Sequence, residues 1–368
     1  MSKLLIVGLP FFPHKYQYQV SSYRSIGVDV RVLLNSDVNC DEELKNELFY
    51  YAGTNKIRRI YTYLKVLYSF RPNNIDCYDY SIFSILYVLI ARLFGVNVRF
   101  WLIGWELVGD TQNSNNDSFF SKLIINFKKN LSRICLRFAN TIYAKEHHHI
   151  KTIKSINPKL LNKVEKIYNC VPILDEKPNF DIASQKDFLY ANAVIEKRNV
   201  TSLIKALSDL RSMNVSFSAA IYGFNSISND VYAPRGTPYS EKALELYYEL
   251  KLEESVQVFG FVNNIKEVMK GYKFFILPAE IILANYALLE AMSFGLVPII
   301  YPGDGYEVMI EDGVNGIVAY DFNLVKAMER ALSLSESEYK KMSDAAYSKI
   351  KQDFSLELWK IKLSKHLN

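Results

Sequence analysis

Residues suited to phosphate and sugar chemistry gather in one stretch, Phe274 to Ile300, with the sequence FFILPAEIILANYALLEAMSFGLVPII. The pattern predicts a strand, a loop, a helix that begins near Asn285 and ends at Gly295, and a second strand. In a parallel sheet such a crossover places the loop and the helix N-terminus at the carboxyl edge, where ligands bind. That helix start favours an anion, and a phosphate fits best. Glu290, a carboxylate inside this apolar helix, needs a hydrogen-bond donor, which a ribose diol would supply.

Weaker candidates for chemistry lie in the first half of the chain. His14 falls in the loop expected after the first strand, as a catalytic or acceptor-binding group or as a solvated side chain. Glu106 and Asp110 follow the strand predicted from Val98, and either could act as a base, bind a sugar hydroxyl or cap a helix. The run His147–His149 invites a metal, but consecutive helical side chains point about 100° apart. We therefore expect a solvated patch there and no metal site.

Strands and helices alternate along the whole chain. The opening segment predicts a buried strand, a helix from about Gln17 to Ile26 and a second strand from Val28 to Leu34, which together form a βαβ unit. The second half repeats the alternation more regularly. The sequence therefore predicts an α/β protein with two Rossmann-like, doubly wound domains that face each other across a cleft. A connection rich in proline and charge separates domain 1–177 from domain 178–352, and a last helix, 353–368, can return to the first domain.

The composition indicates a globular protein. A chain of 368 residues exceeds what one core usually covers, and 49% hydrophobic with 23% charged residues excludes extensive disorder. The four cysteines, Cys40, Cys77, Cys135 and Cys170, show no Cys-x-x-Cys spacing. This argues against a zinc site or a disulfide framework and favours reduced thiols in the cytoplasm.

Charge is distributed unevenly between the two halves. Residues 1–177 hold 24 Lys and Arg against 15 Asp and Glu, a net +9, whereas the remainder holds 20 against 24, a net −4. A basic half is typical of proteins that meet nucleic acid or a membrane surface. The helix predicted over 119–140 alternates cations with large apolar residues, so it could lie on an anionic bilayer, although an ordinary surface helix has the same pattern. We expect a peripheral position on the inner face of the cell membrane and no nucleic-acid partner.

The second half resembles the C-terminal domain of retaining glycosyltransferases of family 4 (glycosyl transferases group 1), which have the GT-B fold. Five segments stand in the family's order: NCV at 169–171, the loop with Glu196 and Lys197 ahead of LIKAL, FGFV at 259–262, P…LLEAMSFG…P over 278–298, and EDGVNGIV at 311–318. The resemblance covers roughly residues 165 to 335. The first half matches only in its βαβ layout.

The resemblance implies a donor-binding site. Lys197 matches the lysine that neutralises the donor diphosphate, on which negative charge builds up as the glycosidic bond breaks. Glu290 matches the glutamate that binds the ribose hydroxyls. The residues that match the nucleobase region and the phosphate-binding loop are Phe261, Val262, Leu283, Ala284, Asn285 and Tyr286.

Two positions depart from the family pattern. The first glutamate of the paired motif would fall at Ile282, and Glu280, two residues earlier, is the carboxylate that could reach the same space. The arginine that precedes the lysine would fall on Asn192, so Arg198 or Arg235 would have to supply that cation. Losing such a charge costs about 3 kcal/mol, or ~10² in rate, unless it is replaced.

These features predict a retaining glycosyltransferase that moves a hexose from a nucleotide sugar, best a UDP-sugar, to a lipid-linked or surface-polysaccharide acceptor. The family needs no metal, because side-chain cations and helix N-termini take its place, so we expect no cofactor. The catalytic candidates are Lys197, Glu280, Glu106 and His14.

Two alternatives stay open. The chain could be a degenerate, non-catalytic subunit that binds nucleotide or stabilises a partner, which Ile282 and Asn192 suggest. It could also be a nucleotide-sugar epimerase, which needs acid and base groups close to a sugar carbon.

Overall fold

The computed structural model describes residues 2–8, 13–34, 49–53, 55–78, 82–102, 107, 119–224, 237–262, 264–365 and 367. The chain divides into two compact units: Met1–Tyr168 with Trp359–Asn368, and Asn169–Leu358. The boundary expected after Lys177 thus falls inside the second unit. Asn169 already bonds to that unit, since its Nδ2 donates to the carbonyl of Ala284 at 2.8 Å.

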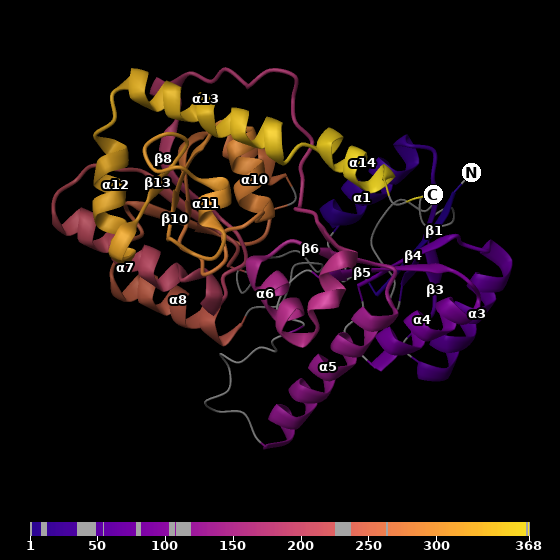
Figure 1. Ribbon diagram of the computed structural model, residues 1–368. Helices are drawn as coiled ribbons and strands as arrows, with labels where there is room; N and C mark the ends of the chain where they lie inside the picture. The colour runs from indigo at the N-terminus through magenta and orange to yellow at the C-terminus, as the bar shows by residue number, and fades with distance from the viewer. Residues whose placement is uncertain are drawn as a thin grey trace. The chain divides into compact units, whose positions relative to one another are not determined.

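The first unit contains a parallel sheet whose seven described strands follow the order β3-β2-β1-β4-β5-β6-β7. The strands are β1 (Lys3–Val7), β2 (Asp29–Leu34), β3 (Phe49–Tyr51), β4 (Asn74–Cys77), β5 (Asn97–Leu102), β6 (Thr141–Ala144) and β7 (Val164–Lys166). The helices are α1 (Pro13–Ser25), α3 (Lys56–Phe70), α4 (Ile82–Leu93), α5 (Phe119–Phe138), α6 (His147–Ile156) and the end of α14 (Leu356–Ser364) (Figure 1). This is the 3-2-1-4-5-6 order of a Rossmann-like fold, extended by β7.

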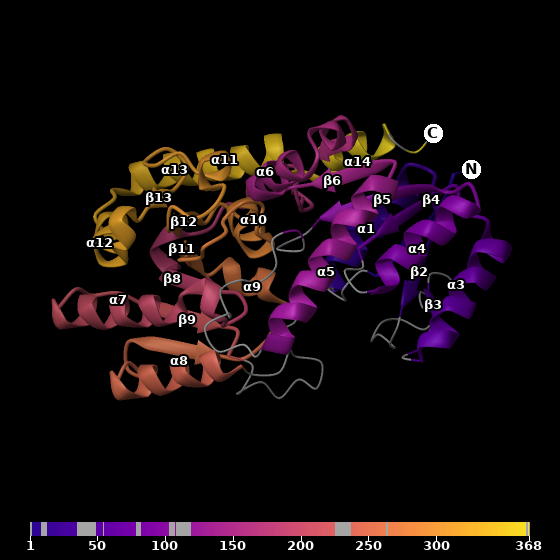
Figure 2. The ribbon, with the colours of Figure 1, turned by 60° about the horizontal axis from the view of Figure 1, so that its bottom comes forward.

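Helices α3, α4 and α5 form one layer of this unit, as Figure 2 shows. Their buried side chains, among them Tyr63, Tyr87 and Leu136, share a hydrophobic core with Leu5 of β1 and Phe100 of β5. The rings of Tyr63 and Tyr87 meet edge to face at 4.7 Å and join α3 to α4. The three helices therefore cover the same face of the sheet.

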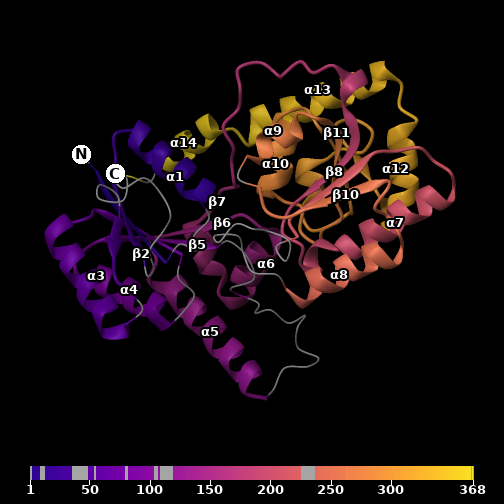
Figure 3. The ribbon, with the colours of Figure 1, turned by 180° about the vertical axis from the view of Figure 1, so that it is seen from behind.

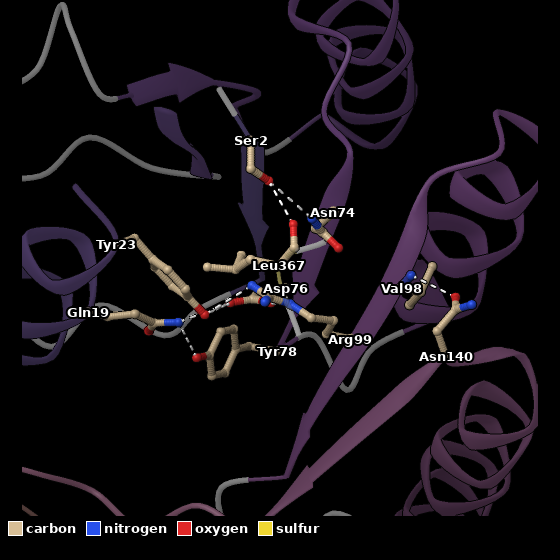
Figure 4. A network of polar contacts seen from close by, with 10 residues as sticks. All are labelled: Ser2, Gln19, Tyr23, Asn74, Asp76, Tyr78, Val98, Arg99, Asn140 and Leu367. Atoms are coloured by element: carbon tan, nitrogen blue, oxygen red, sulfur yellow. Dashed lines mark hydrogen bonds and ion pairs between the residues drawn. The ribbon is translucent and has the colours of Figure 1, made fainter. Parts of the chain in front are cut away.

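The opposite face of the same sheet carries a buried charged network (Figure 4). Arg99 on β5 donates from Nε to Asp76 Oδ1 on β4 at 2.6 Å, and both side chains are at most 1% exposed. Tyr23 of α1 donates to Asp76 Oδ2 at 2.7 Å, and Gln19 Nε2 donates to Tyr78 OH at 2.6 Å. A buried ion pair needs such additional hydrogen bonds to offset the desolvation of both charges. The network therefore ties α1 to the centre of the sheet.

The C-terminal residues complete this face. The ring of Trp359 is buried, with its centroid 6.4 Å from Tyr23 and 6.2 Å from Trp101. Ser2 Oγ donates to the carbonyl of Leu367 at 3.2 Å (Figure 4). The last segment, 353–368, was expected to return to the first domain as one helix. Only its part from Trp359 onward belongs to the first unit, and the residues before Trp359 belong to the second.

The second unit repeats the same topology. Its sheet is also parallel, with the described strands in the order β10-β9-β8-β11-β12-β13. The strands are β8 (Lys186–Ala191), β9 (Ala219–Tyr222), β10 (Val256–Phe259), β11 (Tyr272–Leu277), β12 (Val297–Ile300) and β13 (Ile317–Val318). The helices are α7 (Val200–Ser212), α8 (Pro238–Glu249), α9 (Ile265–Met269), α10 (Tyr286–Ser293), α11 (Tyr306–Met309), α12 (Leu324–Leu332) and α13 (Glu336–Asp353) (Figure 3).

Two Rossmann-like sheets confirm the predicted fold class. The sequence pattern did not predict β3, β4 or β6, each only three or four residues long. The first helix was predicted too short, because α1 begins at Pro13 and proline is favoured in the first turn of a helix. His14 therefore lies on a helix, and its expected place in a loop is wrong.

Candidate functional site

The candidate site lies at the carboxyl edge of the second sheet, where the strand order reverses. Strand β8 pairs with β9 on one side and β11 on the other, so the loops that follow β8 and β11 leave the sheet at this switch point. Open parallel sheets bind ligands in the crevice that such diverging loops create. The sequence placed its candidates for diphosphate binding in these two loops and at the start of the following helix, whereas the nucleobase candidates Phe261 and Val262 follow β10.

Hydrogen bonds join the two loops at the residues expected to act on the donor. The backbone N–H of Glu280 donates to the carbonyl of Lys197 at 3.1 Å. Asn199 Nδ2 donates to Pro278 O at 3.0 Å, and Arg198 Nη1 donates to Ile281 O at 3.3 Å. The structure thus brings together Lys197, Arg198 and Glu280, and all three side chains are partly exposed.

A third loop, which follows β12, holds the β11 loop from the other side. The N–H of Asp304 donates to Glu280 O at 2.7 Å, and the carbonyl of Asp304 accepts from Ile282 and Leu283 at 3.0 and 3.1 Å. The approach requires glycine, because a Cβ on Gly303 would lie 2.7 Å from Glu280 O and closer still to Ala279 O. The sequence carried no signal for this function of Gly303.

Helix α10 begins at this loop and is capped by its own side chain. Asn285 Oδ1 accepts from the N–H groups of Ala287 and Leu288 at 3.1 and 3.3 Å, as expected of an N-cap asparagine. Asn192 Nδ2 donates to the same oxygen at 3.2 Å and so links the β8 loop to the cap. Ala284 just before it adopts φ +49°, a conformation unusual for alanine.

Residues Leu283 to Tyr286 are the ones that match the phosphate-binding loop, and two of their four backbone amides already bond inside the loop. Leu283 N–H donates to Asp304 O, and Asn285 N–H donates to Ile282 O at 3.2 Å. The positive end of the α10 dipole still points at this place, and the backbone of Lys197 bonds to the β11 loop that leads into the helix. Phosphate binding would therefore depend more on side-chain cations than the sequence suggested.

Glu290 lies one turn after the first helical residue, Tyr286, on the same side of α10. The residue is only 7% exposed, between the buried Leu289 and Ala291. Ile282, which occupies the place of the family's first glutamate, is fully buried, whereas Glu280 is partly exposed. Of the two positions, Glu280 is therefore the one that solvent or a ligand can reach.

Arg198 is a cation held close to the site. Its guanidinium donates a hydrogen bond to the β11 loop, and its positive charge acts on the hydroxyl of Tyr190 on β8. Burial raises the pKa of the Tyr190 hydroxyl well above its ordinary value, and the charge of Arg198 opposes that rise. The hydroxyl donates to Ala193 O at 2.9 Å and so holds the β8 loop. Arg235, the other expected substitute cation, lies outside the described residues.

The residues expected near the nucleobase follow β10. Phe261 is 40% exposed and Val262 is half-buried. The neighbouring rings of Tyr222 and Phe259 stack at 4.5 Å. Gly223 adopts φ +116° beside Asn192, where a Cβ would clash with the backbone carbonyl, so no other residue fits there. The sequence carried no signal for Gly223 beyond a glycine at a strand end.

The candidates of the first half are described only in part. Glu106 and Asp110 lie outside the described residues, and His14 is placed only by its position in the first turn of α1. The site described here is therefore built from the second unit alone.

The expected solvated histidine patch is wrong for two of the three residues, because His147 is exposed but His148 and His149 lie against Glu146. His149 is fully buried, and His148 Nδ1 and His149 Nε2 lie 3.2 and 3.9 Å from Glu146 Oε2. One possible ligand atom from each of Glu146, His148 and His149 lies within 4.8 Å of the other two, so the preceding glutamate and two neighbouring histidines converge where three histidines could not. The N–H of Glu146 donates to His149 Nδ1 at 3.4 Å, which keeps the proton of a neutral imidazole on Nε2 and opposes a metal ion there.

Part of the chain matches a known protein family. Residues 174–349 match the family model of the glycosyl transferases group 1. The chain is similar to the capsular polysaccharide biosynthesis glycosyltransferase CapH of Staphylococcus aureus, with 23% identity over 258 residues. That match covers 68% of this chain and 66% of the relative, just under two thirds of its length.

Solved structures extend the likeness to the whole chain. HepE of Anabaena, in complex with UDP-glucose, gives a TM-score of 0.74 at 14% identity and covers 100% of this chain and 99% of its own. A TarM mutant of S. aureus, in complex with UDP, fondaparinux and α-GlcNAc-glycerol, gives 0.74 at 10% identity and 100% of both chains. At such identities the likeness shows the fold, and it confirms the predicted GT-B class.

Proposed function

We propose that this chain, whose residues 174–349 match the family model of the glycosyl transferases group 1, is a glycosyltransferase that transfers a hexose from a UDP-sugar, with retention of configuration at the anomeric carbon. The observation that carries the proposal is the hydrogen bond between Glu280 and Lys197 at the switch point, which places a carboxylate and a cation in adjoining loops. UDP is the proposed nucleotide because HepE and TarM were solved with it.

In the proposed reaction the acceptor attacks the anomeric carbon from the same face that the nucleotide leaves. The acceptor oxygen bonds to the anomeric carbon while the bond from that carbon to the diphosphate oxygen breaks, and the departing diphosphate takes the acceptor proton. Lys197 and Arg198 stabilise the charge that grows on the diphosphate, and Glu290 accepts hydrogen bonds from the ribose. With two cations and a helix dipole at one place, we propose that no divalent metal is needed.

A lysine substitution tests the proposal directly. We expect Lys197→Ala to lower kcat about 10²- to 10³-fold, because removing one group that stabilises developing charge costs about 3 to 4 kcal/mol. Lys205→Ala, an exposed lysine on the neighbouring α7, is the matched control and should change nothing. Transfer should persist in excess chelator, and NMR of the product should show the donor's anomeric configuration.

The proposal fails if a panel of nucleotide sugars shows neither transfer nor hydrolysis and calorimetry detects no binding of UDP or GDP. Equal activity of Lys197→Ala and Lys205→Ala would refute only the role of Lys197 and would leave the proposed reaction standing. No specific observation favours the non-catalytic subunit or the epimerase over this reaction.

We propose a lipid-linked or surface-polysaccharide acceptor, reached at the inner face of the membrane. The CapH relative is named for capsular polysaccharide biosynthesis. None of the described helices is both long and apolar enough for a transmembrane span. Helix α5 instead exposes Leu123, Ile124 and Phe127 near its start, among the cations of the 119–140 segment. These side chains suit contact with an anionic bilayer.

A further inference from the structure

Helix α3 is apolar on two opposite sides. One side packs into the core of the first unit through Tyr63, Val66, Leu67 and Phe70. The other side exposes Ile57, Tyr61, Leu64 and Tyr68, which are 80, 66, 36 and 71% accessible to solvent. Their spacing of four, three and four residues aligns them in one stripe along the helix, here called the outer stripe. A surface helix normally carries polar residues in such positions.

Cations border the outer stripe, and acids are absent from it. Arg58 and Lys65 each follow a stripe residue and are exposed, and the guanidinium of Arg71 lies 5.8 Å from the ring of Tyr68. The sequences of α3, α4 and α5 together hold ten Lys and Arg and neither Asp nor Glu. One whole helical layer of the unit is therefore cationic.

Apolar side chains are also exposed on α4, which lies in the same helical layer as α3 (Figure 2). Leu93 and Phe94, at the end of α4, are 85 and 50% exposed. Helix α4 is joined to α3 by the cation–π contact of Arg59 with the ring of Phe83, at 4.0 Å. The apolar exposure is thus spread over neighbouring helices and is not confined to a single side chain.

We infer that the outer stripe of α3 is a membrane-contact site that rests on the headgroup region of an anionic bilayer. Tyrosines and aliphatic side chains suit the boundary between headgroups and acyl chains, and the bordering arginine and lysine suit anionic headgroups. A second copy of the chain is a poorer occupant, because a two-fold contact would press this cationic face against itself. The inference deepens the proposed function, since a bilayer-bound enzyme would meet a lipid-linked acceptor.

Vesicle binding by the full chain tests the inference. The apolar variant combines Ile57→Ser, Tyr61→Ser and Tyr68→Ser, and the charge variant combines Arg58→Gln with Lys65→Gln. The charge variant should bind about 30-fold more weakly to vesicles of equal parts phosphatidylcholine and phosphatidylglycerol, at about 1 kcal/mol for each lost cation. The apolar variant should lose at least as much affinity for these vesicles. Its remaining binding should disappear at high salt, because only charge attraction is left.

The control variant combines Tyr248→Ser and Lys242→Gln, exposed residues on α8 of the second unit. It should bind vesicles as the unchanged chain does. All variants alter exposed side chains, so circular dichroism and thermal unfolding should match and exclude misfolding as the cause.

Equal vesicle binding by the outer-stripe variants and the control would overturn the inference. A second result would also overturn the inference. The unchanged chain would fail to bind anionic vesicles, and analytical ultracentrifugation would show that the apolar variant is a monomer where the unchanged chain is a dimer. Calorimetric UDP binding separates this outcome from a failure of the proposed function, because the outer-stripe variants leave the donor site intact. A chain that binds vesicles but no nucleotide would refute only the proposed function.

Discussion

The glycine at position 303 offers a test of how the candidate site is held together. A Cβ added there would lie 2.7 Å from the carbonyl oxygen of Glu280 and closer still to that of Ala279. Real Cβ atoms essentially never approach other atoms closer than 3.0 Å, so the β11 loop has to move. Both obstacles are backbone atoms, which cannot rotate away as a flexible side chain can. Overpacking of this kind costs about 1 to 3 kcal/mol.

The displacement should reach the donor residues. Glu280 accepts from Asp304 through its carbonyl and donates to Lys197 through its amide, so a shift of Glu280 changes its place relative to the lysine. A misplacement of about 1 Å in a positioned group lowers catalysis by up to about a hundredfold. We expect Gly303→Ala to reduce kcat/KM for the donor by that factor and to lower the free energy of unfolding.

Gly271→Ala is the matched control for this prediction. Gly271 lies in the same unit, and an added Cβ would find Val268 O at an ordinary 3.5 Å. Steady-state transfer assays and urea unfolding of the two variants make the comparison. If Gly303→Ala and Gly271→Ala proved equal in both measurements, the close packing of the β11 and β12 loops would have no part in activity.

Three further outcomes are expected. Glu290→Gln should weaken UDP binding in calorimetry by about tenfold, because its hydrogen bonds to ribose become weaker. Glu336→Gln is an exposed control that should leave UDP binding unchanged. Equal affinities of the two variants would show that Glu290 does not bind the nucleotide. Asp76→Asn should lower the free energy of unfolding by about 3 to 5 kcal/mol because it leaves Arg99 buried without its counter-charge, and a loss below 1 kcal/mol in urea titrations would contradict this. Burial raises the pKa of Tyr272 from 10.0 to about 12, so its contribution to stability is complete below pH 10 and is lost as the pH rises towards 12. Chemical unfolding across that range should show a smaller loss in Tyr272→Phe, and identical slopes would refute it.

Local patterns predicted the elements that carry the site. The apolar run before Pro278, the N-cap at Asn285 and the glycine at 295 placed β11 and α10 almost to the residue, because each signal acts within one turn or strand. The same kind of reasoning missed β3, β4 and β6, since three or four residues hold too little pattern to separate a strand from a loop. The roles expected of Glu106 and Asp110 stay predictions, because both residues lie outside the described part of the chain.

Long-range contacts explain where the site in the structure differs from the site expected from the sequence. The sequence alone determined two alternating α/β units and a helix start that suits phosphate, because propensity and periodicity are properties of neighbouring residues. Only the tertiary structure decided that Glu280 lies against Lys197, that Ile282 turns inward and that His149 is buried beside Glu146. Backbone hydrogen bonds between loops leave no signature in side-chain type. The geometry of the donor site therefore appears only when the strands pair and bring their carboxyl ends together.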